Sequence, residues 1–166
     1  MVPDRVRRHH YRIMTELSDR LATLVWKTKQ IFDAYSDEET SKPTIAGGWS
    51  RKQIIGHLID SASNNHQRFV RALLQDEIHL PPYDQEGNVR VQRYQEMQWG
   101  QLVGLWESYN RFLAHVLAGV PEAKLNTPCY IGNNPVMTLE ELAEDYVRHM
   151  QHHLEQCAGS LTVAAR

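Results

Sequence analysis

The feature that most constrains this sequence is a three- and four-residue spacing of apolar side chains over several long stretches. From residue 99 to residue 120 the spacing predicts a helix that ends at Gly119, before Pro121. A similar stripe between Met14 and Phe32 predicts a first helix over about residues 4–36. No segment shows the alternation of a convincing strand, so the sequence predicts an all-α fold.

Two further helices are predicted by capping boxes. Ser50 and Gln53 have the spacing of an N-cap and its N3 partner, and this helix should run to about Gln75. Thr138 and Glu141 repeat the arrangement and begin the last helix at Thr138. Each box satisfies orphan backbone donors of the first turn and therefore fixes where its helix starts.

Two long connections join the predicted helices. Residues 76–98 contain Pro81-Pro82 and are longer than the usual helix connection, so they either cross the bundle or cover a site. Residues 121–137 contain three prolines and are expected to form an irregular crossover. The sequence thus predicts a four-helix bundle with long crossover connections, formed by residues 1–166 as a single domain. Cofactor sites in such bundles lie between facing helices.

Composition limits the possible partners. A formal net charge of −2 gives no basic surface for nucleic acid, and no apolar run approaches the roughly 20 residues of a membrane span. The first eight residues lack the apolar segment of a signal peptide, and two cysteines, Cys129 and Cys157, are too few for a disulfide framework. We therefore expect a cytoplasmic protein that binds small molecules or another copy of itself, and neither nucleic acid nor membranes.

Two histidines, His149 and His153, lie one turn apart on the apolar face of the last predicted helix. A buried imidazole needs a partner, which could be a carbonyl, a tyrosine hydroxyl or a divalent metal. His57 has a similar inward position in the second helix and could face the pair if the two helices are neighbours. Three neutral nitrogen ligands with an open position are typical of a catalytic rather than a structural zinc site. Cys157 lies about 12 Å along the helix from His149 and is predicted to be a core residue.

A polar stripe accompanies the apolar one on the second helix, within about 100° of arc. It is either a solvated face or part of the bundle interior, and its members are His57, Asp60, Ser61, Asn64 and Arg68. Other positions of this helix, including Lys52, are expected to face solvent. In the interior interpretation Asp60 and Asn64 orient a bound water or a ligand histidine, and Arg68 holds a substrate carboxylate. An inward Arg–Asp or Arg–Tyr pair that only ties helices together is the structural alternative.

Several motifs together resemble one known family over about residues 10–158. They are Gly48-Trp49-Ser50-x-x-Gln53-Ile54-Ile55-x-His57-Leu58-x-Asp60-Ser61, Arg68-Phe69, Tyr83-Asp84-Gln85, Thr138-Leu139-Glu140-Glu141-Leu142 and Tyr146-x-x-His149-x-x-x-His153. This combination resembles the DinB-like superfamily, and within it the YfiT-type branch of metal-dependent hydrolases. The resemblance implies a four-helix bundle with one crossed connection that forms a homodimer.

The resemblance also implies a nickel or zinc ion held by three side chains, at positions that correspond to His57, His149 and His153. His152 sits about 100° round the helix and is not expected to bind. Related branches transfer low-molecular-weight thiols, so the leading hypothesis is an enzyme in which one divalent metal activates a thiol or a water, with thiol S-transfer preferred. Asp60, Asn64 and Arg68 are its candidate catalytic residues. A metal-dependent hydrolase, a non-catalytic metal-binding stress-response module and a metal-free dimerisation domain are the alternatives.

Overall fold

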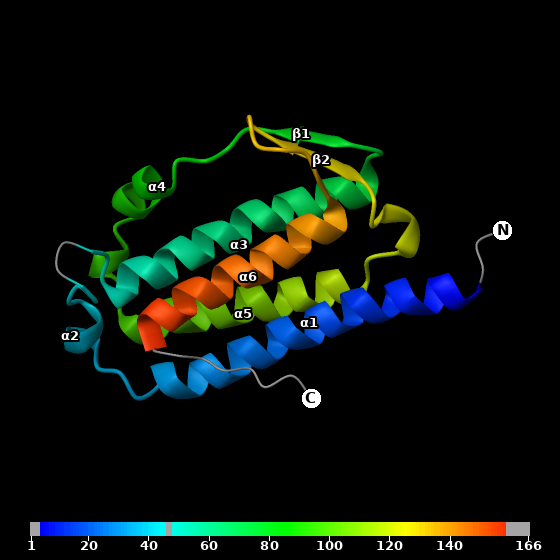
Figure 1. The fold of residues 1–166 in the computed structure, drawn as a ribbon. Coiled ribbons are helices and arrows are strands. Elements are labelled where there is room, and N and C mark those ends of the chain that lie inside the picture. Colours follow the sequence, from blue (N-terminus) through cyan, green and yellow to red (C-terminus); the bar gives the residue numbers. More distant parts are fainter. Residues whose placement is uncertain (1–3, 46–47, 159–166) are drawn as a thin grey trace.

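The computed structural model describes residues 4–45 and 48–158, with side chains from residue 13 onward, and shows a four-helix bundle (Figure 1). The long helices are α1 (Asp4–Phe32), α3 (Arg51–Leu74), α5 (Trp99–Ala118) and α6 (Leu139–Ala158). Helices α1 and α3 each pack against both α5 and α6. The predicted four-helix class is confirmed, and the second and fourth long helices, α3 and α6, are neighbours.

Both predicted capping boxes are present. The Ser50 hydroxyl accepts a hydrogen bond from the Gln53 amide, and the Gln53 side chain accepts one from the Ser50 amide. At the start of α6 the Thr138 hydroxyl accepts a hydrogen bond from the Glu141 amide, and the Glu141 carboxylate accepts one from the Thr138 amide. The first helix ends earlier than predicted, at Phe32, whose carbonyl accepts a hydrogen bond of 2.8 Å from the Trp99 indole. The spacing of apolar residues along the helix could not predict this end, because Trp99 is distant in the sequence.

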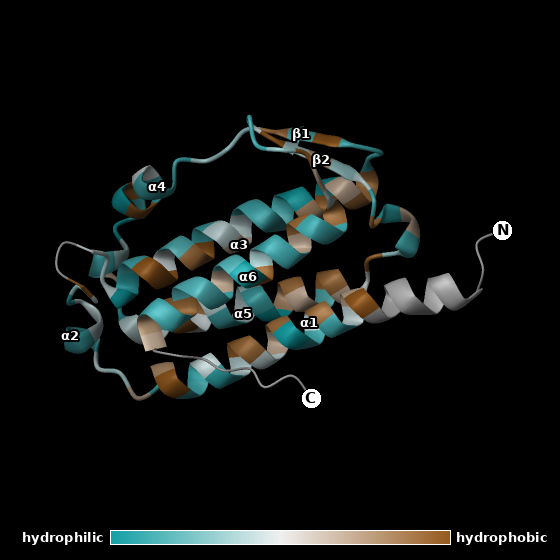
Figure 2. Ribbon diagram, viewed as in Figure 1, coloured by the Kyte–Doolittle hydropathy of each residue, from teal (hydrophilic) through white to brown (hydrophobic). Residues whose placement is uncertain are grey.

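The interior of the bundle is apolar, with an aromatic cluster where α1 ends and α5 begins. The Phe32 ring lies 5.1 Å from Trp99 and 5.8 Å from Trp106 between ring centroids, and both tryptophans are buried. Each long helix carries hydrophobic and hydrophilic residues together (Figure 2). Burial of the apolar faces is the main force that holds the helices together. No helix among residues 4–45 and 48–158 is both long enough and apolar enough to cross a membrane.

The expectation that the chain has no strand is wrong. Three short strands, β1 (Ile78–Leu80), β2 (Pro128–Ile131) and β3 (Met137–Thr138), form a sheet in the order β1-β2-β3, above one end of α3 and α6 (Figure 1). Strand β1 pairs parallel with β2, and β2 pairs antiparallel with β3. Strands this short contain too few residues to show an alternating pattern, and β1 finds its partner only in a distant part of the sequence.

The connection between α3 and α5 crosses the length of the bundle (Figure 1). After β1 it forms α4 (Gln85–Gln92) and the 3₁₀ turn η1 (Tyr94–Glu96), and both pack against α3. The approach is closest at Gly56, where a Cβ atom would lie 2.0 Å from Cδ2 of Tyr94. The second connection contains the 3₁₀ turn η2 (Glu122–Lys124) before it enters β2.

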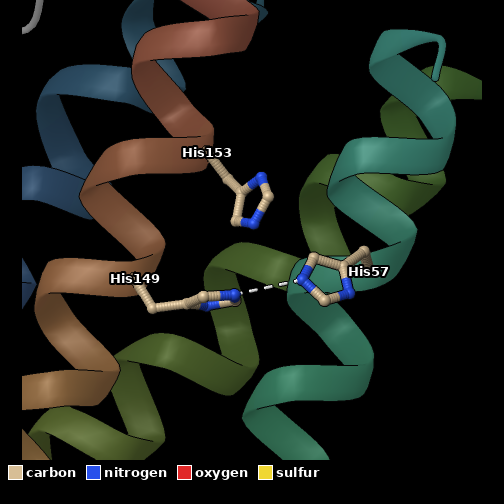
Figure 3. A group of neighbouring side chains, drawn as sticks. All are labelled: His57, His149 and His153. Carbon is tan, nitrogen blue, oxygen red and sulfur yellow. Dashed lines mark hydrogen bonds between the residues drawn. The ribbon is translucent and has the colours of Figure 1, made fainter. Parts of the chain in front are cut away.

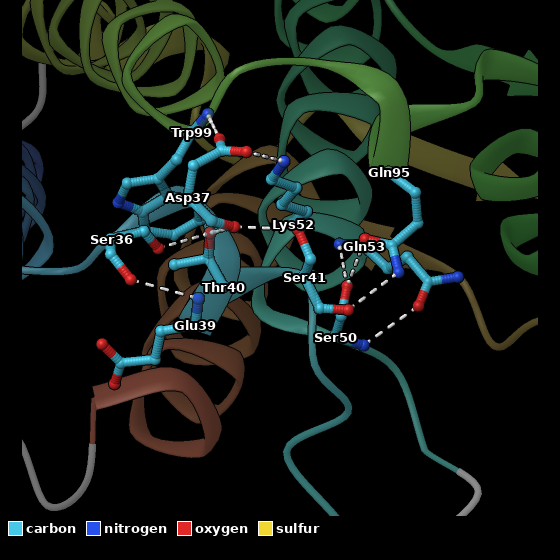
Figure 4. A network of polar contacts seen from close by, with 10 residues as sticks. All are labelled: Ser36, Asp37, Glu39, Thr40, Ser41, Ser50, Lys52, Gln53, Gln95 and Trp99. Carbon is cyan, nitrogen blue, oxygen red and sulfur yellow. Dashed lines mark hydrogen bonds and ion pairs between the residues drawn. The ribbon is translucent and has the colours of Figure 1, made fainter.

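A polar network fixes the beginning of α3 (Figure 4). Lys52 is only 2% exposed, and its Nζ donates to Oδ2 of Asp37 at 2.9 Å, in the short helix α2 (Asp37–Thr40). The other Asp37 oxygen accepts from the backbone amide of Trp99 at 2.7 Å. The prediction that Lys52 faces solvent is therefore wrong, because α2 and the start of α5 cover it. The network ties three elements together close to the turn that carries His57.

Candidate metal centre

Three histidine side chains converge between α3 and α6 (Figure 3). His57 comes from α3 and His149 and His153 come from α6, and one ring nitrogen of each lies within 4.8 Å of the other two. The Nε2 atoms of His57 and His149 are 3.2 Å apart. The structure therefore brings together the three residues that the sequence predicts as ligands.

The packing of the two helices explains this convergence. On α6 the histidines alternate with the buried residues Tyr146, Met150 and Leu154, which anchor that face in the core. On α3 the side chain of His57 is 0% exposed and its ring lies 5.3 Å from the Trp49 ring. An imidazole in this position is held in one orientation by close packing.

Burial keeps all three imidazoles uncharged. Desolvation, and secondarily the neighbouring His153 and His149, lowers the pKa of His57 from 6.5 to about 3. Desolvation and His153 lower the pKa of His149 to about 4, and desolvation also lowers the pKa of His153. At neutral pH each ring therefore has an unprotonated nitrogen, which is the form in which histidine binds metal ions.

The donor set fits a divalent ion. Two imidazole nitrogens bound to zinc at tetrahedral angles are separated by about 3.3 Å, and the His57–His149 separation is 3.2 Å. His153 Nδ1 faces the Gln156 side-chain oxygen at 2.9 Å, which places the proton on Nδ1 and leaves Nε2 free to act as a ligand. His57 Nδ1 is buried and has no hydrogen-bond partner among the described residues. His152 is exposed and is not part of the group.

A cavity of about 200 Å³ adjoins the histidine group on the His149 side. It lies between α3 and α6, is bordered by the segment around Tyr83 and by the turn between β2 and β3, and is partly open to solvent. The segment around Tyr83 and the turn between β2 and β3 are in contact. A Cβ atom at Gly132 in the turn, whose φ is +59°, would lie 2.8 Å from Cδ of Pro82 in the segment. Of the two alternatives expected for the crossing connection, the structure shows that it spans the bundle (Figure 1), and the same segment also forms part of the wall of this cavity.

The candidate catalytic residues differ in their positions. Arg68 lies on the cavity wall, where its Nη1 donates to Oδ1 of Asn65 at 3.3 Å. Asp60 is 5% exposed and does not line this cavity; its Oδ1 accepts hydrogen bonds from the Tyr94 hydroxyl at 2.7 Å and from Gln92. Burial raises the pKa of Asp60. Asn64 is also outside the wall and donates to the Asp60 carbonyl at 2.9 Å. The roles of the three residues stay predictions.

Several neighbours of the site were not singled out from the sequence. Asn65, Asp145 and Gln156 could have been found by helical spacing, because each lies three or four residues from a candidate ligand or arginine on the same helix. Tyr94 and Gln92 reach Asp60 from another segment, so no local signal points to them.

Neither cysteine is a nucleophile at neutral pH. Burial raises the pKa of Cys129 to about 11 and that of Cys157 to about 12, so both thiols stay protonated. Cys129 donates weakly to the Thr127 carbonyl at 3.4 Å. Cys157 is 1% exposed and packs in the core, as predicted.

Comparison with known proteins identifies related chains. The sequence profile of the DinB superfamily matches residues 21–157. A protein of Bacillus subtilis strain 168 with the name "Putative metal-dependent hydrolase YfiT" is 28% identical over 130 residues, which are 77% of this chain and 72% of that protein. A Bacillus pumilus protein named "Putative metal-dependent hydrolase" is 26% identical over 137 residues, which are 82% of this chain and 78% of that protein. The solved structure of YfiT from Bacillus subtilis, with its unusual four-helix bundle topology, matches with a TM-score of 0.69 and 21% identity, over 94% of this chain and 86% of that chain.

Proposed function

The chain belongs to the DinB superfamily, and we propose that it is an enzyme in which His57, His149 and His153 hold one divalent ion, nickel or zinc. The observation that carries this proposal is the convergence of three uncharged imidazoles beside a cavity. When bound, the ion supplies Lewis-acid chemistry that lowers the pKa of a thiol or a water at its open position. Imidazole ligands suit both metals, and the relatives are named for metal dependence.

The remaining residues have supporting roles. Gln156 orients His153 through the hydrogen bond to Nδ1, and the packing around His57 fixes the second ligand. Arg68 positions the substrate on the cavity wall. Asp60 keeps the crossing segment seated on α3 through the hydrogen bonds that it accepts from Tyr94 and Gln92, and Asn64 donates to the Asp60 carbonyl within the same helix.

The proposed reaction is transfer of a low-molecular-weight thiol to an electrophile. Hydrolysis requires a group that takes a proton from water and returns it to the leaving group. Asp145 is the one carboxylate among the described residues that line the cavity, and it is ion-paired with Arg148. A thiol has an ordinary pKa near 8.5, so a small lowering of that pKa by the bound ion would ionise it at neutral pH without a dedicated base.

A metal-dependent hydrolase is the second candidate. The specific support for it is the name that the two Bacillus relatives carry. In that reaction Asp145 would leave its pairing with Arg148 to act as the base.

Metal content and turnover together test the proposal. Protein purified without a histidine tag, or reloaded with nickel or zinc, should contain about one equivalent of metal, as a site with three protein ligands and one ion requires. His57→Ala should contain none, and His115→Ala, which removes an exposed histidine of α5, should match the wild type. The loaded wild type should then consume a thiol such as cysteine in the presence of 1-chloro-2,4-dinitrobenzene.

The outcomes separate the candidates. Cleavage of an activated ester without any thiol would establish the hydrolase. Stable metal binding without turnover of either substrate would indicate a binding module. A wild type that takes up neither nickel nor zinc would overturn the metal site itself.

A further inference from the structure

One positive charge on the cavity wall, that of Arg68, makes no ion pair with any described carboxylate. Arg68 is half-buried, and its one hydrogen bond to another described side chain goes to the neutral amide of Asn65. No carboxylate of the described residues lies within the 4.0 Å of an ion pair with this guanidinium. Burial accordingly lowers the pKa of Arg68. A partly desolvated cation without a counter-ion is unfavourable unless a ligand supplies the missing charge.

The opposite wall supplies no ion pair for Arg68. Asp145 of α6 also lines the cavity, and its charge partly offsets that of Arg68, but its carboxylate pairs directly with Arg148 on the same helix. Tyr83 lies beside Arg68, and burial raises the pKa of its hydroxyl, which therefore stays a neutral donor. Arg68 is thus the one charged side chain among the described lining residues that makes no ion pair.

The cavity connects this charge to the histidine group. Its α3 wall extends from Ser61 to Arg68, two positions seven residues apart and therefore separated by about 10 Å along the helix. Its α6 wall ends at His149, whose ring meets His57 across the two helices. A volume of about 200 Å³ is below the range of roughly 300–1,000 Å³ that holds a drug-sized ligand, so the occupant is a small molecule.

We propose that Arg68 forms a carboxylate-binding subsite, and that the substrate is a small monoanion whose carboxylate binds Arg68 while its reacting group lies at the His149 end of the same cavity. This inference rests on the proposed function. The planar guanidinium offers two parallel donors that match a carboxylate, and Asn65 fixes its orientation. A phosphate dianion fits less well, because Arg68 is the one cationic side chain among the described lining residues.

Ligand binding without metal tests the subsite directly. The probes are hexanoate and its neutral counterpart hexanamide, titrated calorimetrically into metal-free wild type, since a bound ion would itself attract carboxylates. Hexanoate should bind more tightly than hexanamide. Arg68→Gln should weaken hexanoate binding roughly tenfold to hundredfold and remove the preference over the amide. Arg71→Gln, on the exposed side of the same helix, should leave both affinities unchanged.

Three results would overturn the inference: equal affinities of wild type for the two probes, tighter binding of inorganic phosphate than of hexanoate, or hexanoate binding that arises only in Asp145→Asn. The last would mean that Asp145 neutralises Arg68 in solution. The same titrations in His57→Ala separate this inference from the proposed function. A protein that takes up no metal but still selects hexanoate through Arg68 refutes the metal chemistry alone, and a metal-binding protein without that selectivity refutes the subsite alone.

Discussion

Replacing Gly56 by alanine tests how tightly the crossing segment is pressed against α3 beside the histidine group. In the interior of a helix, alanine is normally more stable than glycine by about 0.5–1 kcal/mol. At Gly56, however, the new methyl group would lie 2.0, 2.3 and 2.6 Å from three ring atoms of Tyr94, which is itself only 4% exposed. Carbon atoms pack at about 3.5–4.0 Å, so the ring has to move by more than about 1 Å.

The structure gives the size of the effect. Overpacking of this kind costs about 1–3 kcal/mol. The displaced Tyr94 also loses the 2.7 Å hydrogen bond to Asp60, worth about 1.5–3 kcal/mol for a bond to a charged group. After the gain in helix propensity is subtracted, Gly56→Ala should lower the free energy of unfolding by roughly 2–5 kcal/mol.

Urea denaturation followed by circular dichroism measures this change. Gly104→Ala in α5 is the matched control, because a Cβ atom there meets nothing within 4 Å and should stabilise the protein by about 0.5–1 kcal/mol. In a Tyr94→Phe background the hydrogen bond is already absent, so Gly56→Ala should cost only the overlap. A Gly56→Ala protein as stable as the control would refute the close packing of η1 on α3.

Three further predictions concern the histidine group. His153→Ala should contain no bound metal but retain its helix content, whereas His152→Ala should keep the metal, as measured by elemental analysis. Loss of metal in both variants would mean that the orientation of α6 is wrong. Gln156→Leu should weaken metal affinity about tenfold or more, measured by competition with a chelator, because His153 loses its orienting partner. The folded-state pKa values of His57 and His149, about 3 and about 4, lie below the unfolded value of 6.5, so the folded metal-free protein binds fewer protons. The free energy of unfolding of the metal-free protein should therefore not depend on these two histidines above about pH 6.5 and should decrease as the pH falls below that value. The decrease should be at most about 1.4 kcal/mol per pH unit for each histidine. In urea titrations across this pH range, His57→Gln should show a smaller decrease than the wild type.

Features encoded by neighbouring residues were predicted well from the sequence. The helix starts at Ser50 and Thr138 follow from capping pairs three residues apart, and the burial of Cys157 follows from its place on an apolar face. The same logic placed His149 and His153 together, because a one-turn spacing is a local property. To predict that His57 meets the two histidines, the sequence analysis needed one further assumption, that α3 and α6 are neighbours, and they are.

Features that depend on distant segments could not be predicted in this way. Lys52 has the spacing of a solvent-facing residue, and only the position of Asp37 and the start of α5 makes it a buried ion-pair partner. The sheet exists because β1 meets β2 across most of the chain between α3 and α6. Asp60 belongs to the polar stripe of α3, but its hydrogen-bond partners, Tyr94 and Gln92, come from the crossing segment.

The two parts of the candidate site therefore have different structural origins. The histidines lie on α3 and α6, where packing of the bundle core holds them. The cover of the cavity comes instead from the two connections, around Tyr83 and at the turn that contains Gly132. Substitutions on the outer side of these connections can change the shape of the cavity without moving the histidines, because loops tolerate change better than packed helices. Arg68 stands between the two parts, since it belongs to helix α3 but lines the cavity together with residues of the two connections.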